Sequence, residues 1–261
     1  AITTTEGMAE ELKHYVPKGF INRNTASEEM LKLSEEAYEK AVAEKKAEGR
    51  KTVKLGYFSG SITHNDDFIL IQPAVAKIME KYPQTELHIA GILDIPKEFE
   101  AFKERVIAHP FADWKKLPEM IASMDINLAP LEESIFNEAK SENKWVEAAL
   151  VRVPTIASNL GAFKRMIEHN KTGILANTCE EWYEGLEALI VDTQKRERIA
   201  KAAYDYCEVH CVTLYTGFPL MKFIKSMYVP NIAMVLPALN ISGGIMVAFE
   251  HCKVLREHGY D

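Results

Sequence analysis

The residues best suited to chemistry lie between positions 128 and 175. If a helix begins at Ser141, then Lys140, Lys144 and Glu147 fall on one side of it, because positions i, i+4 and i+7 share a helical face. Two lysines one turn apart repel each other, so an anion such as a diphosphate beside them would favour the arrangement. An ordinary surface ion pair between Lys144 and Glu147 explains the same spacing equally well.

The place of this helix in the chain favours anion binding. The helix follows a predicted strand that ends at Pro130, so its first turn is expected at the carboxyl edge of a sheet. Doubly wound folds bind ligands at that edge, and the free N–H groups of a helix start attract negative charge. The loop "GSITHND" follows the first strand of the same sheet and offers backbone N–H groups, hydroxyls and polar side chains to a phosphate. The candidates there are Gly60, Ser61, Thr63 and His64. Asp66 is expected to cap the next helix, and capping alone would also explain its neighbour His64.

Short apolar runs alternate with amphipathic stretches from about residue 50 to 212, which predicts an α/β fold whose parallel sheet is covered on both faces. The predicted strands are "TVKLGYF", "ELHIAG", "VIAHPF", "INLAP", "VPTIAS" and "TGILA". The predicted helices lie at 66–82, 97–104, 115–123, 141–150, 162–169, 180–191 and 194–210.

The flanking segments follow other patterns. Residues 27–48 form a charged helix that Ser27 caps and Gly49 ends, and we interpret it as a solvated connector. Residues 213–230 are a helical linker. Residues 231–261 read as a strand, a glycine loop and a helix, with Gly243 and Gly244 in the loop.

Composition narrows the classes of function. With 47% hydrophobic and 26% charged residues among 261, the chain is typical of a globular protein, and a net charge of −7 argues against broad nucleic-acid binding. The four cysteines fit a reducing compartment, and no apolar stretch is long enough to span a bilayer. The motif "CEVHC" lacks a fourth zinc ligand, so no metal site is expected. We therefore expect a cytoplasmic protein.

The stretch "KWVEAALVRVPTIASNLGAFKRMIEHNKTGILA" resembles the donor-binding domain of the group 1 (family 4-like) glycosyltransferases of the GT-B fold. That family's signature runs Lys-x-x-Glu-Ala, then Gly-x-Pro-x-x-Ala-Ser, then Thr-Gly-Ile/Leu-Leu. The stretch "KLGYFSGSITHNDDF" is similar to its first strand and loop, and "FADWKKLPEMIASMDINLAPL" is similar to its base-binding section. The resemblance covers about residues 50–212 and implies a Rossmann-like sheet that binds a nucleotide sugar.

The resemblance also implies roles for individual residues. Glu147 would accept hydrogen bonds from the donor ribose, and Lys144 would stabilise the leaving diphosphate. Lys140 and Ser141 would join the same nucleotide site. The family places a sugar-binding glutamate at the position of Ala139, so the neighbouring Glu138 is the catalytic candidate beside Lys144. Arg152 is a second departure from the family pattern, because the family commonly has glycine at this position. We interpret it as a solvent-facing turn residue.

The two ends resemble parts of the family's other domain. Residues 1–24 are similar to the last helix and strand of an N-terminal domain, and residues 231–261 are similar to its beginning. We therefore expect an internal piece of a tandem glycosyltransferase, whose terminal unit packs on the domain or pairs with another copy. Gly243 and Gly244 are then expected to take no part in the donor site.

The expected function is a retaining hexosyltransferase of bacterial surface polysaccharide synthesis that uses a nucleotide sugar and a glycan acceptor. It requires no further cofactor, and the intact protein is expected to be cytoplasmic, with peripheral attachment to the inner membrane. This piece alone should have little activity. Two alternatives are a sugar-nucleotide epimerase of the same architecture and a non-catalytic nucleotide- or partner-binding module.

Overall fold

The structure is a computed structural model that describes residues 1–49, 52–59, 65–91, 97–227 and 243–257. Its largest feature is a six-stranded parallel sheet with the strand order β5-β4-β3-β6-β7-β8. The strands are β3 (Val53–Ser59), β4 (Thr85–Gly91), β5 (Val106–His109), β6 (Ile126–Ala129), β7 (Thr155–Ser158) and β8 (Ile174–Ala176). All six predicted strands and the doubly wound α/β class are therefore confirmed.

The central strand β3 is the point at which the sheet changes direction. Leu55 pairs with Leu87 of β4 on one side and with Ile126 of β6 on the other. The chain first builds outward through β4 and β5, and then returns to build β6, β7 and β8 in the opposite direction. Such a reversal leaves a crevice at the carboxyl ends of the two strands that part there.

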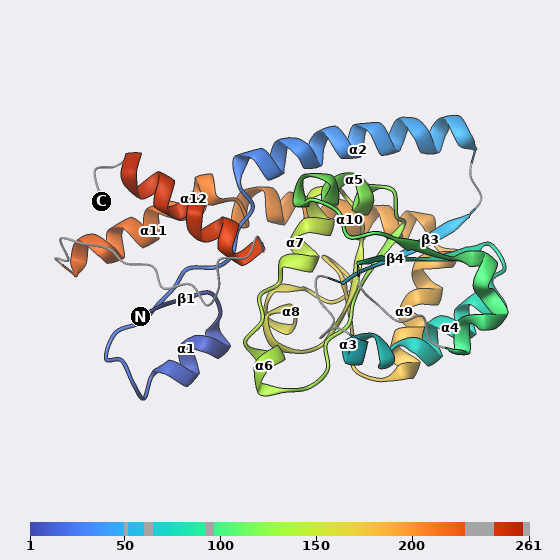
Figure 1. Cartoon of the computed structure of the whole chain (residues 1–261), viewed down its shortest axis with the longest axis horizontal. Coiled ribbons are helices and arrows are strands. Elements are labelled where there is room, and N and C mark those ends of the chain that lie inside the picture. Colours follow the sequence, from blue (N-terminus) through green and yellow to red (C-terminus); the bar gives the residue numbers. More distant parts are fainter. Residues whose placement is uncertain (50–51, 60–64, 92–96, 228–242, 258–261) are drawn as a thin grey trace.

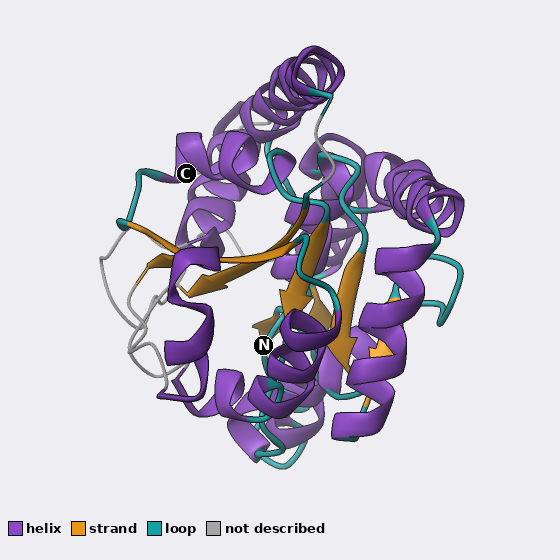
Figure 2. Ribbon diagram, turned by 90° about the vertical axis from the view of Figure 1, so that its right-hand side faces the viewer, coloured by secondary structure: helices purple, strands orange, loops and turns teal. Residues whose placement is uncertain are grey.

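Helices cover both faces of the sheet (Figure 2). The first face carries α3 (Asn65–Ile69), α4 (Gln72–Lys81), the 3₁₀ helix η2 (Lys97–Arg105) and α9 (Cys179–Val191). The second carries the 3₁₀ turn η3 (Trp114–Lys116), α5 (Leu117–Ala122), α7 (Asn143–Leu150) and α10 (Thr193–His210). The helix predicted over 66–82 is split into α3 and α4. Pro73 explains the split, because proline fits the first turn of α4 but not a helix interior.

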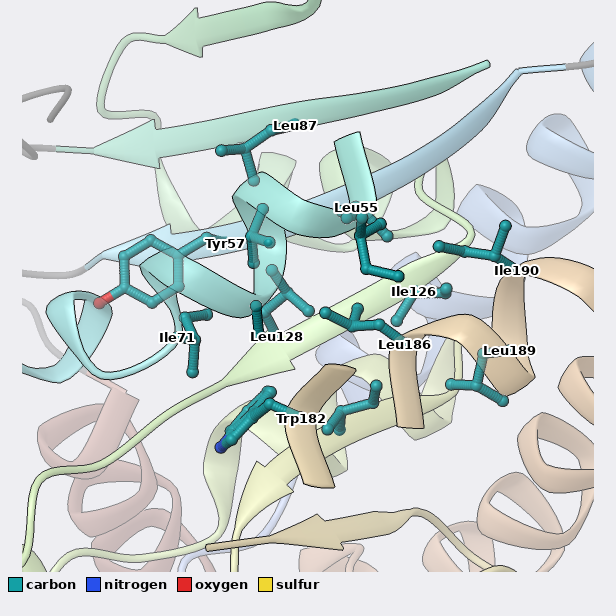
Figure 3. Packing of buried hydrophobic residues seen from close by; sticks show 14 of the residues in the cluster. Leu55, Tyr57, Ile71, Leu87, Ile126, Leu128, Trp182, Leu186, Leu189 and Ile190 are labelled. Carbon is teal, nitrogen blue, oxygen red and sulfur yellow. The ribbon is translucent and has the colours of Figure 1, made fainter. Parts of the chain in front are cut away.

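The main core lies between the sheet and α4 with α9 (Figure 3). Leu55 and Tyr57 of β3 are fully buried there, together with Leu128 of β6 and Leu186 of α9. Each buried side chain of this size stabilises the fold by about 1.5–3 kcal/mol. Trp182 also packs in this core, so the sheet is fixed from the side opposite α7.

The helix α2 (Glu28–Glu48) begins and ends as predicted, since Ser27 Oγ accepts the Met30 N–H at 3.1 Å and Gly49 is left-handed. The prediction that this helix is solvated holds for its outer face only, because its inner face is packed on the domain. Ala37 and Ala41 are buried against α5, because small side chains on one face allow two helices to approach closely. Figure 1 shows α2 lying along the domain above α5.

Arg152 is not a solvent-facing turn residue, as the sequence had indicated. Its guanidinium lies between the rings of Tyr38 and Tyr204, 4.0 and 3.7 Å from their centroids. It also donates to both carboxylate oxygens of Glu35 at 3.1 and 3.2 Å. These contacts join α2, α10 and the turn after α7. They offset the cost of a φ of 56°, about 1–2 kcal/mol for a residue with a Cβ.

Elements from the first and last described parts of the chain lie together beside the sheet (Figure 1). The elements there are β1 (Ile2–Thr3), α1 (Glu6–Leu12), β2 (Phe20–Ile21), α11 (Thr213–Ser226) and α12 (Gly243–Glu257). Leu255 of α12 packs against Leu220 and Ile224 of α11, and Phe20 stacks on Phe223.

The terminal helix therefore packs on the rest of the chain. The helix begins at Gly243, so Gly243 and Gly244 lie in its first turn and not in the predicted loop. The strand predicted from residue 231 lies outside the described residues, and the division into domains stays a prediction. No helix in the described part of the chain is long and apolar enough to cross a bilayer.

Replacing Arg152 by Ala should lower the free energy of unfolding by about 2 kcal/mol, because it removes the cation–π and ion-pair contacts. Arg152→Gly should cost about 1 kcal/mol less, because glycine adopts the positive φ without strain. Urea denaturation measures both values. The exposed Arg198→Ala on α10 is the control and should stay within about 0.5 kcal/mol of wild type. Equal losses for Ala and Gly would show that the turn is not strained.

Candidate functional site

A buried carboxylate, Asp67 of α3, lies where the segments after β3 and β6 meet. Its Oδ1 accepts hydrogen bonds from the Glu132 N–H at 2.8 Å and from the Asn137 side-chain amide at 3.1 Å. Its Oδ2 lies 3.5 Å from the Lys140 ammonium, and its side chain is only 3% exposed. Asp67 thus joins the segment after β3 to the segment after β6. Sequence reasoning missed it, because its partners lie in the segment after β6, far away in the chain.

Lys140 does not stand on the same helix as Lys144, because α7 begins at Asn143. The predicted stacking of the two lysines one turn apart is therefore wrong. Lys140 lies in the irregular segment between α6 (Ile135–Glu138) and α7, where it contacts the Phe136 ring at 5.1 Å and pairs with Asp67. Part of the negative charge expected near the lysines is supplied by the protein itself.

Lys144 is the least satisfied polar group of the site. Its stem is partly exposed, but the ammonium nitrogen is shielded from solvent and lies 5.0 Å from the centroid of the Tyr57 ring. It has no hydrogen-bond partner among the described residues. Burial lowers the pKa of Lys144 to about 8; Asp67 and Glu147 oppose this effect, whereas Lys140 adds to it. A buried ammonium without acceptors is unfavourable, so an anionic ligand here would relieve a cost already present.

Glu147 lies on α7 one turn after Lys144 and lines a pocket of about 120 Å³. Asn143 and Val146 of the same helix line it too, opposite the apolar side chains of Trp114 and Leu117. Burial raises the pKa of Glu147 to about 7, although Lys144 opposes this effect. The helix therefore presents an ammonium and a carboxylate close together, with a cavity in front of the carboxylate.

Two buried contacts fix the position of α7. The Trp145 indole N–H donates to the Thr172 carbonyl at 2.8 Å, and Trp145 is fully buried. The Asn127 side chain on β6 donates to the Lys144 carbonyl at 3.0 Å and to Thr155 at 3.1 Å. The backbone of Lys144 is thereby tied to two neighbouring strands.

Glu142, directly before α7, is a second buried carboxylate that sequence reasoning missed. Its side chain is 1% exposed and lies 3.4 Å from Arg23, which also pairs with Glu6 of α1. Burial raises the pKa of Glu142; a backbone hydrogen bond and Arg23 oppose this effect. The start of α7 is thus held by the N-terminal part of the chain.

Ser141 and Glu138 lie at the edge of this arrangement. Ser141 Oγ accepts a hydrogen bond from the Asn24 amide at 2.9 Å. Glu138 ends α6 with a 45% exposed side chain, 3.8 Å from Arg165. Gly161, where α8 (Gly161–Met166) begins, has a φ of 55°, and a Cβ there would stand 3.1 Å from the Glu138 carbonyl. This close approach fixes the end of α6.

The remaining predicted phosphate contacts fall in the loop after β3. Gly60, Ser61, Thr63 and His64 lie outside the described residues. The helix that follows starts at Asn65, so Asp66 stands in its first turn. Within the described residues, no three His, Cys, Asp or Glu side chains gather as metal ligands would.

A doubly wound parallel sheet with this strand order is a Rossmann-like domain, a fold that binds ligands at the carboxyl ends of its strands. Residues 54–192, more than half of the chain, match the family described as "Glycosyl transferases group 1". The chain belongs to this family, and the resemblance seen in its sequence is confirmed.

Solved structures show the same fold. HepE of Anabaena in complex with UDP has a TM-score of 0.69 at 18% identity, over 86% of this chain and 63% of that one. A glycosyltransferase from Rickettsia africae gives 0.67 at 15% identity, over 87% and 62%. WaaG, a glycosyltransferase involved in lipopolysaccharide biosynthesis, gives 0.63 at 18% identity, over 85% and 60%. The chain thus spans less than two thirds of the length of these proteins. No curated protein matches it.

Glu147→Gln should flatten the pH dependence of stability between about pH 4.5 and 7. The folded protein keeps the Glu147 proton up to about pH 7, whereas the usual pKa is 4.5, so the folded state binds more protons in this window. Stability therefore falls as the pH rises through it. The difference from wild type should be on the order of 1 kcal/mol, since water in the pocket screens the carboxylate.

Urea denaturation at several pH values measures this difference, with the exposed Glu180→Gln variant as control. Parallel pH profiles for wild type and Glu147→Gln would contradict the burial of this carboxylate.

Lys144→Met should remove a rise of stability between about pH 8 and 10.5, because the lysine pKa is lowered in the folded state. The same urea denaturation series, extended to this pH range, measures the change.

Proposed function

We propose that this chain is the donor-binding part of a retaining glycosyltransferase that moves a sugar from a nucleotide sugar to a glycan acceptor. The observation that carries the proposal is the Lys144 ammonium, which is shielded from solvent and has no acceptor among the described residues. Glu147, on the same helix, faces a pocket. A nucleotide sugar can bind both groups. Its diphosphate accepts hydrogen bonds from the ammonium, and its ribose hydroxyls donate them to the carboxylate.

Lys144 would act on the leaving group. Negative charge develops on the nucleotide diphosphate as the bond to the sugar breaks, and a fixed ammonium in a shielded site stabilises that charge strongly. Lys140 adds positive charge nearby, and Ser141 completes the nucleotide-binding segment. Glu138, exposed at the end of α6, would contact the transferred sugar.

The similar structures support the choice of substrates to test. HepE was solved with UDP and with UDP-glucose, and WaaG takes part in lipopolysaccharide biosynthesis. We extend this to a bacterial, cytoplasmic enzyme of surface polysaccharide synthesis, in which a longer polypeptide supplies the acceptor side. The chain alone would bind donor nucleotide and transfer little. Ala139, in place of the sugar-binding glutamate, favours a non-catalytic nucleotide-binding module as the second candidate.

Calorimetric titration with UDP, GDP and dTDP tests the proposal, and at least one should bind. Glu147→Ala should weaken that binding roughly tenfold to a hundredfold, the effect of a lost hydrogen bond to a charged group. Lys144→Ala should weaken binding of the nucleoside diphosphate more than binding of the corresponding monophosphate. Lys164→Ala, exposed on α8, is the control and should bind like wild type. A folded chain that binds none of the three nucleotides would refute the donor site.

A further inference from the structure

The pocket in front of Glu147 has a wall that comes from the far end of the chain. Val247 and Glu250 of α12 line it together with Glu147 and Val146 of α7. Met30, in the first turn of α2, completes the apolar surface. The sequence assigned no role in the donor site to Gly243 and Gly244, but the helix that they begin reaches the pocket through Val247 and Glu250.

Contacts away from the pocket hold α12 in this place. His251, next to Glu250, is 3% exposed and lies 3.0 Å from the Asn22 amide. Leu255, one turn later, is buried against α11. The start of α11 is in turn joined to the pocket, because Thr213 is hydrogen-bonded at 2.8 Å to Thr25, a lining residue. Glu250 is thus positioned by the buried contacts of the residues that follow it on α12.

The polar side chains of the pocket differ in whether they already have a hydrogen-bond or ion-pair partner in the protein. Glu29 is paired with Lys115 at 2.6 Å. No hydrogen bond or ion pair is made, within the part of the chain that the structure describes, by the side chains of Asn143, Glu147 and Glu250. Two carboxylates from different helices therefore open onto one cavity with their acceptor oxygens unused. Each carboxylate can therefore accept hydrogen bonds from a ligand in the cavity.

The apolar part of the pocket suits a flat ring. Trp114, Leu117 and Met30 line the pocket with an aromatic ring and two flexible or branched apolar side chains. A nucleoside has this division of character, with a planar base at one end and vicinal hydroxyls at the other. Aromatic side chains stack on any base, and hydroxyls donate to carboxylates.

We propose that α12 completes the nucleoside pocket and that Glu250 accepts a hydrogen bond from one ribose hydroxyl while Glu147 accepts from the other. The inference rests on the proposed donor binding and adds a residue from a separate helix to it. It assigns to the terminal helix a direct part in recognising ribose. Val247 shields the hydroxyls from water on the same side.

The test uses the whole chain and calorimetry with UDP and GDP, followed by the 2′-deoxy and 3′-deoxy forms of the tighter ligand. Glu250→Ala should weaken the ribonucleotide roughly tenfold, and it should reduce the preference for the ribonucleotide over one of the two deoxy forms. Glu250→Gln keeps one acceptor oxygen and should have an intermediate effect. Glu257→Gln, exposed on the same helix, is the matched control and should change neither quantity.

The outcomes separate the two proposals. Absence of nucleotide binding by the wild-type chain overturns the donor site and this inference together. Wild-type binding that Glu250→Ala leaves unchanged overturns the inference alone. Equal weakening of the ribonucleotide and both deoxy forms also overturns it, since the carboxylate would then not contact a hydroxyl.

Discussion

The carboxylate of Asp67 is buried where the two halves of the sheet part, and its oxygens are bonded to the segment that follows β6. A buried carboxylate is tolerated only when its acceptor sites are filled, so α3 and the backbone at Glu132 must keep their relative positions. Lys140 follows from the same requirement, because it supplies the opposite charge. The surroundings of Lys144 therefore depend on α3, which follows the first strand of the sheet, as well as on its own helix α7.

That arrangement leaves Lys144 in an environment that costs stability. Its ammonium is shielded, its acceptors are missing from the described chain, and Glu147 is held at the edge of the pocket with an elevated pKa. Binding sites commonly retain groups that would be more stable elsewhere, because a ligand then gains what the protein lacks. The buried hydrogen bond of Trp145 fixes α7 and therefore the backbone that carries both groups.

The sequence allowed the sheet to be predicted because each strand is a short apolar run whose identity depends on local pattern alone. It also placed Glu147 and Lys144 on one helix, since their spacing is a property of that helix. Asp67 was missed because its partners lie more than sixty residues away in the chain, and no local pattern carries that information. Glu250 was missed for the same reason: the packing of α12 on α11 decides which pocket it meets.

Arg152 has a consequence for how related chains diverge. Glycine at this position needs no support, whereas arginine depends on Tyr38, Tyr204 and Glu35 to hold a backbone that its own Cβ disfavours. A lineage that keeps arginine cannot lose either ring without leaving the turn strained. A lineage that returns to glycine frees all three partners to drift. The four positions are therefore energetically coupled, although they lie on two helices and a turn. Substitutions at them should occur together in related chains.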